Sequence, residues 1–405
     1  MRQKISGFRS VLQRELKIMM SDLDILVIIL LSPLFYGLFY GSAYMHKTEV
    51  EVPVIVVDQD HSALSRQFIR DLQAHQLIRI VRLESSLQAA QNDLQSWQAQ
   101  AIVWIPREFE HRLKQGKHST VKLYLNASRF LPANDINRAV QEVVATMDAG
   151  LRIRYLQRKE LNFKQALKHY EPLRLDDRNL FSPALTYGDF LIPGILVLIL
   201  QQTLLFGLAM SIARETETNG WRDLYQRGNG SVWAVMSGKS FPYFVLYTAY
   251  SMFFFTVYFS LFRLPFRGNF AAFLLLTVVF LITVIYLSVF VGTLFERKII
   301  ALQFLVFTSY PVFLLSGFSW PVSAMPVVLQ WITQCLPTTP YLQAMSRITA
   351  MGANIKDVFP EIFHLLLLGG IGLLLTRVRI KYYLNRTIRT KLPSPLFNLA
   401  QRIKR

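Results

Sequence analysis

The sequence contains a single cysteine and few charged residues. Cys335 has no partner within the chain, so an intramolecular disulfide and a metal site built from several cysteines are both excluded. Charged residues make up 17% of the 405 residues, below the roughly 25% usual for soluble domains. They are missing altogether from long blocks such as 299–346. We therefore expect membrane-spanning helices rather than an apolar globular core.

Motifs for catalysis and nucleotide binding are also lacking. Gly238-Lys239-Ser240 resembles the end of a phosphate-binding loop, but the first glycine of that motif would fall at Trp233, and no strand precedes it. We therefore expect that this chain binds no ATP, no other cofactor and no metal. Five histidines lack the paired spacing of metal ligands and are interpreted as surface residues: His61, His75, His111, His118 and His169.

Six apolar runs are long enough to cross a bilayer at about 1.5 Å per residue. They are 25–44, 190–213, 240–262, 269–295, about twenty residues from Ile299, and about 358–376. The first run is too long for the apolar core of a signal peptide and is interpreted as a retained anchor. We expect an α-helical polytopic membrane protein with six transmembrane helices, the first within 24–45 and the others within 189–376.

The net charge of +18 is explained by orientation in the membrane rather than by nucleic acid. Twenty Lys and Arg lie in the segments 1–23, 214–239, 295–298 and 377–405, against four in the two short segments on the other side. The positive-inside bias therefore predicts that both termini, the basic tail 377–405 included, are cytoplasmic in a bacterial inner membrane.

Residues 1–23 are predicted to form a helix that lies on the inner leaflet. Phe8, Val11, Leu12, Leu16 and Met19 recur at helical spacing, with basic residues opposite. A frayed cytoplasmic tail is the alternative, and the interfacial helix is favoured because its apolar stripe runs directly into the first span.

The segment 46–188 is the one sizeable hydrophilic block, and it predicts an inserted extracytoplasmic α/β domain. Strands are expected at 52–57, 77–83, 101–105 and 121–125, and helices at 62–72, 86–97, 107–114 and about 132–168. Asp58 and Asp60 end the first strand, where active sites occur, but a turn-forming and helix-capping role is favoured. Asn126-Ala127-Ser128 is a glycosylation triplet that matters only in an organism that glycosylates secreted chains.

Two glutamines interrupt the second apolar run at mid-depth. Gln201 and Gln202 are costly in a membrane unless they face a partner helix or an aqueous path. The sequence supports two interpretations of these glutamines equally, contact with a neighbouring helix and a role facing a transport pathway.

The block 299–346 is longer than one span and is broken by six prolines and glycines, which predicts short apolar helices at the outer surface, about 316–345.

Three stretches together resemble the permease subunits of ABC-2 type (type V) ABC exporters, in the subgroup with a large extracytoplasmic domain after the first transmembrane helix. Val52–Ser62, with Trp104–Phe109, resembles the opening motifs of that domain, "VPVxVVDxDxS" and "IPxxF". Arg214–Lys239 resembles the family's cytoplasmic coupling loop, although Asn219-Gly220 replaces the usual Gly-Thr and the usual proline is missing. Leu315–Pro340 resembles its re-entrant outer hairpin.

The resemblance implies a similar role for this chain as a multidrug-type ABC transporter permease. Two ATPase subunits, which bind ATP and Mg²⁺, would dock on the coupling loops of two permeases, either two copies or a pair of homologues. A periplasmic adaptor could contact the outer domain. The residues implied at the coupling loop are Arg214, Glu215, Glu217, Gly220, Trp221, Asp223 and Leu224. Those implied at the re-entrant hairpin are Ser316, Gly317, Pro321, Met325, Pro326, Pro337 and Pro340.

Two other classes of function are weaker on the sequence. A membrane-anchored sensor or scaffold would use the outer domain to bind a ligand or partner, but a simple sensor needs only two spans. A membrane enzyme would need an ionisable centre within the spans, and only His364, alone in the last apolar run, is of that kind.

Overall fold

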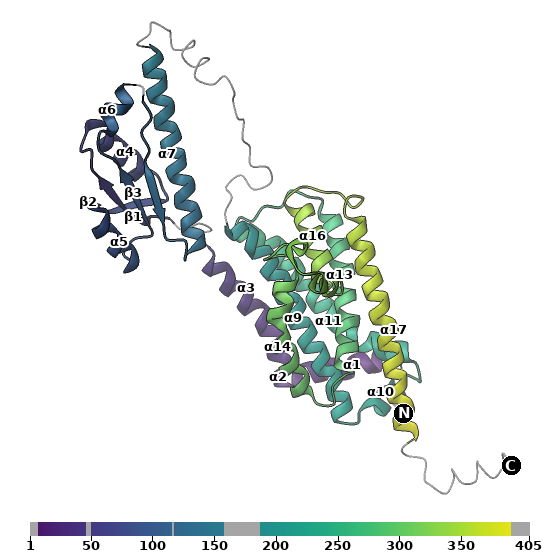
Figure 1. The fold of residues 1–405 in the computed structure, drawn as a ribbon. Coiled ribbons are helices and arrows are strands. Elements are labelled where there is room, and N and C mark those ends of the chain that lie inside the picture. The colour runs from purple at the N-terminus through teal and green to yellow at the C-terminus, as the bar shows by residue number, and fades with distance from the viewer. Residues whose placement is uncertain (1–6, 46–49, 116, 158–186, 390–405) are drawn as a thin grey trace, which may run out of the picture. The chain divides into compact units, whose positions relative to one another are not determined.

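The computed structural model describes residues 7–45, 50–115, 117–157 and 187–389. The chain divides into two compact units (Figure 1), one formed by 1–45 together with 179–405 and the other by 46–178. His169, the predicted helix beyond Gln157 and the basic tail from 390 onward lie outside the described residues.

The smaller unit is a four-stranded sheet covered by helices on both faces. Its elements are β1 (Val52–Asp58), α4 (Ala63–Gln73), β2 (Ile78–Glu84), α5 (Leu87–Gln95), β3 (Ala101–Ile105), α6 (Phe109–Lys114), β4 (Lys122–Leu125) and α7 (Phe130–Gln157). The strand order is β2-β1-β3-β4, with β2 and β3 parallel to β1 and β4 antiparallel to β3. Alternate residues of β1 face opposite sides. Val54 and Val56 pack with residues of α4, α6 and α7, whereas Ile55 and Val57 pack with Ala90 of α5.

The turn after β1 is held by its two aspartates. Asp58 accepts hydrogen bonds from the backbone N–H of Asp60 at 3.0 Å and from the hydroxyl of Ser65 at 2.7 Å. Asp60 accepts the backbone N–H of Glu110 at 3.0 Å, and Ser62 caps α4 by accepting the N–H of Ser65. These contacts fit the turn-forming and capping role that the sequence favoured over a catalytic one.

The larger unit is a bundle of long apolar helices. After α1 (Phe8–Ser21) come α2 (Leu23–Leu26), η1 (Val27–Leu31), α3 (Ser32–Ala43), α9 (Tyr187–Glu217), α10 (Trp221–Arg227), α11 (Val232–Phe253), η2 (Phe254–Tyr258), α12 (Phe259–Leu261), α13 (Phe270–Gly292), α14 (Lys298–Leu315), η3 (Val322–Ala324), α15 (Val327–Gln334), α16 (Thr338–Thr349) and α17 (Phe359–Arg389). Six of these helical stretches have the length and the apolar composition that crossing a membrane requires. The chain is therefore a mostly helical, multi-pass membrane protein.

Three helices extend beyond the predicted spans. α9 continues to Glu217, α11 begins at Val232, and α17 continues past Thr376. A helix that emerges into water can continue through charged residues, so the charges from Arg214 onward do not end α9. The start of α11 is marked by Ser231, whose hydroxyl accepts the backbone N–H of Ala234. The polar connection is therefore shorter than the predicted 214–239, and Gly238-Lys239 lies within α11 rather than in a loop.

The first span is irregular where the sequence places Pro33. A π-helical turn, η1, ends two residues before this proline, which has no backbone N–H to donate. The hydroxyl of Tyr250 donates to the carbonyl oxygen of Leu30 at 2.9 Å, and that of Tyr258 donates to Gly37 at 2.9 Å. Neighbouring side chains thus satisfy backbone carbonyls beside the irregular turn, as apolar surroundings require.

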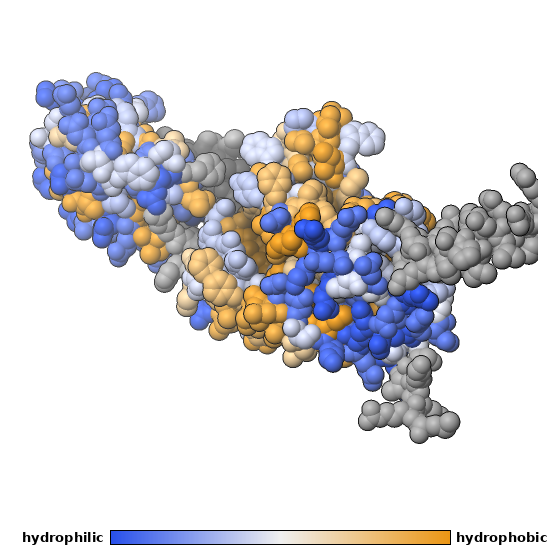
Figure 2. Space-filling model, turned by 90° about the horizontal axis from the view of Figure 1, so that it is seen from below, coloured by the Kyte–Doolittle hydropathy of each residue, from blue (hydrophilic) through white to orange (hydrophobic). Residues whose placement is uncertain are grey.

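The bundle has a central helix, α9, and different elements lie at its two ends. α9 is largely buried and packs against α3, α13 and α14, while α14 itself is largely exposed. α1 and α10 lie at one end of the bundle and α16 lies at the other (Figure 1). Figure 2 views the α1 and α10 end, where hydrophilic residues gather, with hydrophobic residues on the flanks.

Candidate functional site

Helix α1 divides its apolar residues between two faces. Val11, Ile18 and Met19 are buried within the bundle, whereas Leu16 and Met20 are 45% and 70% exposed. The predicted single apolar stripe is therefore split, because part of it packs against α11 rather than facing lipid. The buried face also carries an acid, Glu15, with no exposed surface.

Glu15 belongs to a buried ionic cluster that joins α1, α9 and α11. The ammonium of Lys239 donates to Glu15 Oε2 at 2.6 Å and to Glu215 Oε1 at 2.9 Å. Arg14 donates two parallel hydrogen bonds to Glu215, at 2.6 and 2.8 Å. Glu15, Glu215 and Lys239 are each at most 1% exposed. Two acidic and two basic side chains are in contact here, so opposite charges compensate one another at a place where three of the four side chains are out of contact with water.

Two neutral hydroxyl groups also bind Glu15, and Glu215 stabilises the charged form of Arg14. The hydroxyls of Ser211 and Tyr243 both donate to Glu15 Oε1, the latter at 3.1 Å. Burial disfavours the charged form of Arg14, but the hydrogen bonds and charge of Glu215 outweigh it and raise the pKa of that guanidinium. Arg14 also lies 3.2 Å from Asp223 of α10, which extends the cluster to the surface.

One glycine permits this arrangement by close approach. A Cβ at Gly220 would lie 2.3 Å from Glu215 Oε2 and 3.1 Å from the Arg14 guanidinium. A larger residue there would therefore push the carboxylate out of its bidentate contact.

Helix α10 packs on the bundle through its apolar side chains and carries charged side chains on its exposed face. Trp221 and Leu224 are buried, at 2% and 0% exposure, and Trp221 stacks on Tyr383 of α17 with ring centroids 5.6 Å apart. Arg222 and Asp223 are exposed. Because Trp221 and Leu224 face inward, they can position α10 but cannot contact a partner directly.

A second group of ion pairs links the ends of α1 and α9 with the start of α14. The ammonium of Lys298 lies 2.9 Å from Oδ1 of Asp22 and 2.8 Å from Oδ2 of Asp24. The Nε atom of Arg214 lies 3.5 Å from Oδ2 of Asp22. The exposed carboxylate of Glu217 accepts the backbone N–H of Lys298 at 3.1 Å. Arg214 and Glu217 therefore connect spans with one another, in addition to any contact with a partner.

The coupling-loop residues implied by the sequence thus separate into two groups. Glu215 is buried rather than facing water, contrary to the expectation from its charge, because Arg14 and Lys239 neutralise it. Glu217, with Arg222 and Asp223, lies at the surface. Contact of these residues with an ATPase stays a prediction.

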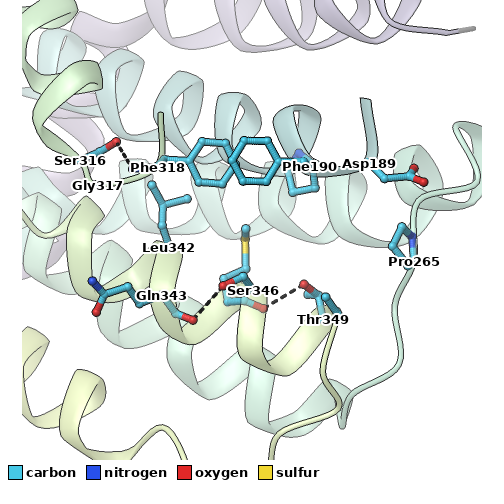
Figure 3. Close-up of a pocket in the computed structure, with 13 residues that line it drawn as sticks. Asp189, Phe190, Pro265, Ser316, Gly317, Phe318, Leu342, Gln343, Ser346 and Thr349 are labelled. Carbon is cyan, nitrogen blue, oxygen red and sulfur yellow. Dashed lines mark hydrogen bonds between the residues drawn. The ribbon is translucent and has the colours of Figure 1, made fainter. Parts of the chain in front are cut away.

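At the opposite end of the bundle, two of the implied hairpin residues, Ser316 and Gly317, line a cavity of about 300 Å³. Figure 3 shows the rings of Phe190 and Phe318 stacked along one side, with centroids 4.7 Å apart, and Leu342 of α16 facing them. The lining of the cavity is mostly apolar. Gly317 has a φ of 78°, a conformation that favours glycine.

The other implied hairpin residues begin or flank its short helices. Pro321 precedes η3, Pro326 precedes α15, and Pro337 precedes α16, the positions at which proline ends one element and starts another. Pro340 is inside the first turn of α16, and Met325 is 8% exposed.

The two glutamines of α9 lie within the bundle. Gln201 is 3% exposed, and neither its Oε1 atom nor the Nε2 atom of Gln202 has a hydrogen-bond partner in the described part of the chain. Unsatisfied polar atoms at this depth are costly. Their position leaves the pathway-facing role a prediction.

Sequence reasoning missed Glu15 and Lys239 as members of a site. One signal was present: Glu15 is an acid on the apolar face of an otherwise basic helix, four residues after Val11 and three before Ile18. An acid at such a position indicates a buried partner, either a cation or a hydrogen-bond donor.

Comparison with known proteins gives the family. A family model described as "ABC-2 family transporter protein" matches residues 24–378. "Inner membrane transport permease YhhJ" of Escherichia coli (strain K12) is 22% identical, over 91% of this chain and 95% of its own. "Probable multidrug ABC transporter permease YbhR" of the same organism is 22% identical over 78% and 82%, and "Linearmycin resistance permease protein LnrN" of Bacillus subtilis (strain 168) is 23% identical over 82% and 88%.

These matches confirm the resemblance that the three motif stretches predicted. The names of these relatives describe them as permeases, one of them of a multidrug ABC transporter. Because the matched region covers most of the sequence, this protein belongs to the ABC-2 family of transporter proteins.

Proposed function

We propose that this chain is the permease subunit of an ABC exporter that moves an amphiphilic, drug-like or lipid-like molecule out across the bacterial inner membrane. Two separate ATPase subunits bind ATP with Mg²⁺ and drive the cycle. Both termini and α10 face the cytoplasm, and the α/β unit lies outside, where it is available to a periplasmic adaptor. Names of two relatives that refer to multidrug transport and linearmycin resistance support this class of cargo.

The observation that carries the proposal is the buried ionic cluster beneath α10. Arg14 and Lys239 hold Glu215 from two different helices, and Trp221 and Leu224 are buried under the same short helix. A force on α10 therefore acts directly on α1 and on the ends of α9 and α11. Such an arrangement suits a lever that an ATPase moves, with Arg222 and its exposed neighbours as the contact surface.

Two further observations support the cargo and the assembly. The cavity beside Phe190 and Phe318 is apolar and of a size at the lower end of ligand pockets, about 300–1,000 Å³, which suits the apolar part of an amphiphile. The exposed side of α14, with Phe307 79% and Tyr310 67% exposed, suits contact with lipid and with a second permease.

Co-purification in mild detergent tests the proposal. Tagged wild-type protein is expected to bring down a nucleotide-binding subunit, and the exposed charge reversal Arg222→Glu is expected to weaken that association. Lys356→Glu is the matched control, because Lys356 is also an exposed base but lies in the 350–358 connection next to α16. Glu215 is unsuitable for this test, since its substitution would disrupt a buried cluster.

The outcomes separate the two main hypotheses. Loss of the ATPase from Arg222→Glu but not from Lys356→Glu supports docking on α10. If wild-type protein brings down no nucleotide-binding subunit, the exporter proposal fails and a sensor or scaffold becomes the better hypothesis.

A further inference from the structure

Helix α17 contacts the coupling segment at one of its ends. The Tyr383 ring stacks on Trp221 of α10, with the two planes inclined by only 9°. The hydroxyl of Tyr383 donates to the carbonyl oxygen of Thr293 at 3.0 Å, and Arg379 donates to the same oxygen at 2.9 Å. This end of α17 is therefore fixed both to α10 and to the end of α13.

At its other end the same helix holds the 316–350 segment. Glu361 accepts a hydrogen bond from Arg347 of α16 at 2.6 Å, and Arg347 also donates to the carbonyl oxygen of Asp357. His364 Nε2 lies 2.8 Å from the carbonyl oxygen of Gln334, the last residue of α15. Both short helices of the segment are thus attached to α17 within its first two turns.

Between these ends α17 packs closely on α13. A Cβ at Gly369 would lie 2.9 Å from Thr283 Oγ1, and one at Gly372 would lie 3.1 Å from the side chain of Leu287. The hydroxyl of Thr283 donates to the carbonyl oxygen of Leu365 at 2.9 Å, and that of Thr376 donates to the carbonyl oxygen of Tyr286. Close backbone approach and interhelical hydrogen bonds hold two membrane helices together.

We propose that the α13–α17 pair is a strut that carries the position of α10 to the 316–350 segment, with Tyr383 and Arg347 as the positioning residues at its two ends. The 31 residues of α17 span about 46 Å, more than the roughly 30 Å hydrocarbon thickness, so one helix reaches both surfaces. Displacement of α10 by an ATPase then moves the 316–350 segment beside the apolar cavity. This inference rests on the proposed function, because it needs the ATPase to move α10.

The sole cysteine provides a reporter for the test. Cys335 is exposed and directly follows α15, so its maleimide labelling rate reports the surroundings of the 316–350 segment without an engineered site. The permease–ATPase complex in lipid nanodiscs is labelled without nucleotide and after trapping with ATP and vanadate. The label on this chain is read from its intact mass.

We expect the labelling rate of wild-type Cys335 to differ between the two states. Tyr383→Ala is expected to abolish this difference while ATP hydrolysis continues, and Tyr383→Phe, which keeps the ring, is expected to retain it. Tyr382→Ala is the matched control, because the neighbouring Tyr382 is 53% exposed. Arg347→Gln tests the far end of the strut and is expected to remove the difference as well.

Two results would overturn the strut. One is a wild-type labelling rate that is the same in both states, and the other is a nucleotide-dependent difference that persists in both Tyr383→Ala and Arg347→Gln. Failure of the proposed function would look different, since no ATPase would then co-purify and hydrolyse ATP.

Discussion

Glu15 and Lys239 are 224 positions apart in the sequence, yet Nζ of Lys239 lies 2.6 Å from Oε2 of Glu15, and each residue is at most 1% exposed. A buried pair of this kind is strongly destabilised when one partner is removed, because an uncompensated charge remains. Here Lys239 also neutralises Glu215, so one ammonium holds two acids from different helices.

Lys239→Met is therefore expected to destabilise the protein strongly. The loss should be about 3–5 kcal/mol, the range for breaking a buried ion pair. Thermal unfolding in detergent gives the comparison with Lys298→Met, which should cost much less because the Lys298 side chain is 27% exposed. Adding Glu15→Gln to Lys239→Met should recover part of the loss. Equal shifts for Lys239→Met and Lys298→Met would contradict the burial of the cluster.

Gly220→Ala is expected to loosen the contact between α1 and α9. The added Cβ collides with Glu215 Oε2, and overpacking of this kind costs about 1–3 kcal/mol. Gly370→Ala is the matched control, since a Cβ at Gly370 in α17 meets nothing within 4 Å. The unfolding temperature should fall for Gly220→Ala and stay the same or rise for Gly370→Ala, and the reverse order would speak against the close approach.

The α/β unit is expected to fold by itself, because its core is built from its own strands and helices. A fragment of residues 46–178 should be soluble and unfold cooperatively. Phe68→Ala removes a ring that is 1% exposed and should cost about 3–5 kcal/mol, whereas Val81→Ala, at a position 41% exposed, should cost little. Urea titration followed by circular dichroism measures both, and a fragment without a cooperative transition would refute the prediction.

The cavity beside α16 is expected to contribute to transport. Gln343 lines it from an exposed position, so Gln343→Trp fills the space without replacing a core residue. Substrate-stimulated ATP hydrolysis by the complex should fall, while basal hydrolysis is kept. Gln334→Trp, at an exposed position that does not line the cavity, should leave the stimulation intact. Stimulation that survives Gln343→Trp would exclude the cavity from the pathway.

Local patterns in the sequence predicted much of the fold. The alternation of β-branched strands with amphipathic helices placed β1 to β4 within a few residues, and apolar run length identified the six candidate spans found in the described residues. Helix ends were predicted less accurately, because α9 and α17 continue through 214–217 and 377–389, which contain several charged residues. Charge alone indicates water near a helix end and does not indicate where the helix stops.

The candidate site was harder to predict, because it depends on packing between distant segments. No pattern near Glu215 in the sequence indicates that its charge is neutralised by Arg14, which lies 201 positions earlier. Its charge predicted a surface position, and the surrounding helices provide a buried one. Trp221 likewise gave no sign of its partner Tyr383, since the two aromatic residues are 162 positions apart in the sequence (221 and 383).

We infer that the ionic cluster makes α1 and the α10 segment move as one body when the ATPase acts. The most direct test is the distance between spin labels at the exposed positions Gln13→Cys and Gln226→Cys, in a Cys335→Ser background, with and without trapped nucleotide. The cluster predicts the same narrow distance in both states, and a broader, nucleotide-dependent distance when Arg14→Gln is added. A wild-type distance that already changes between the two states would contradict the claim.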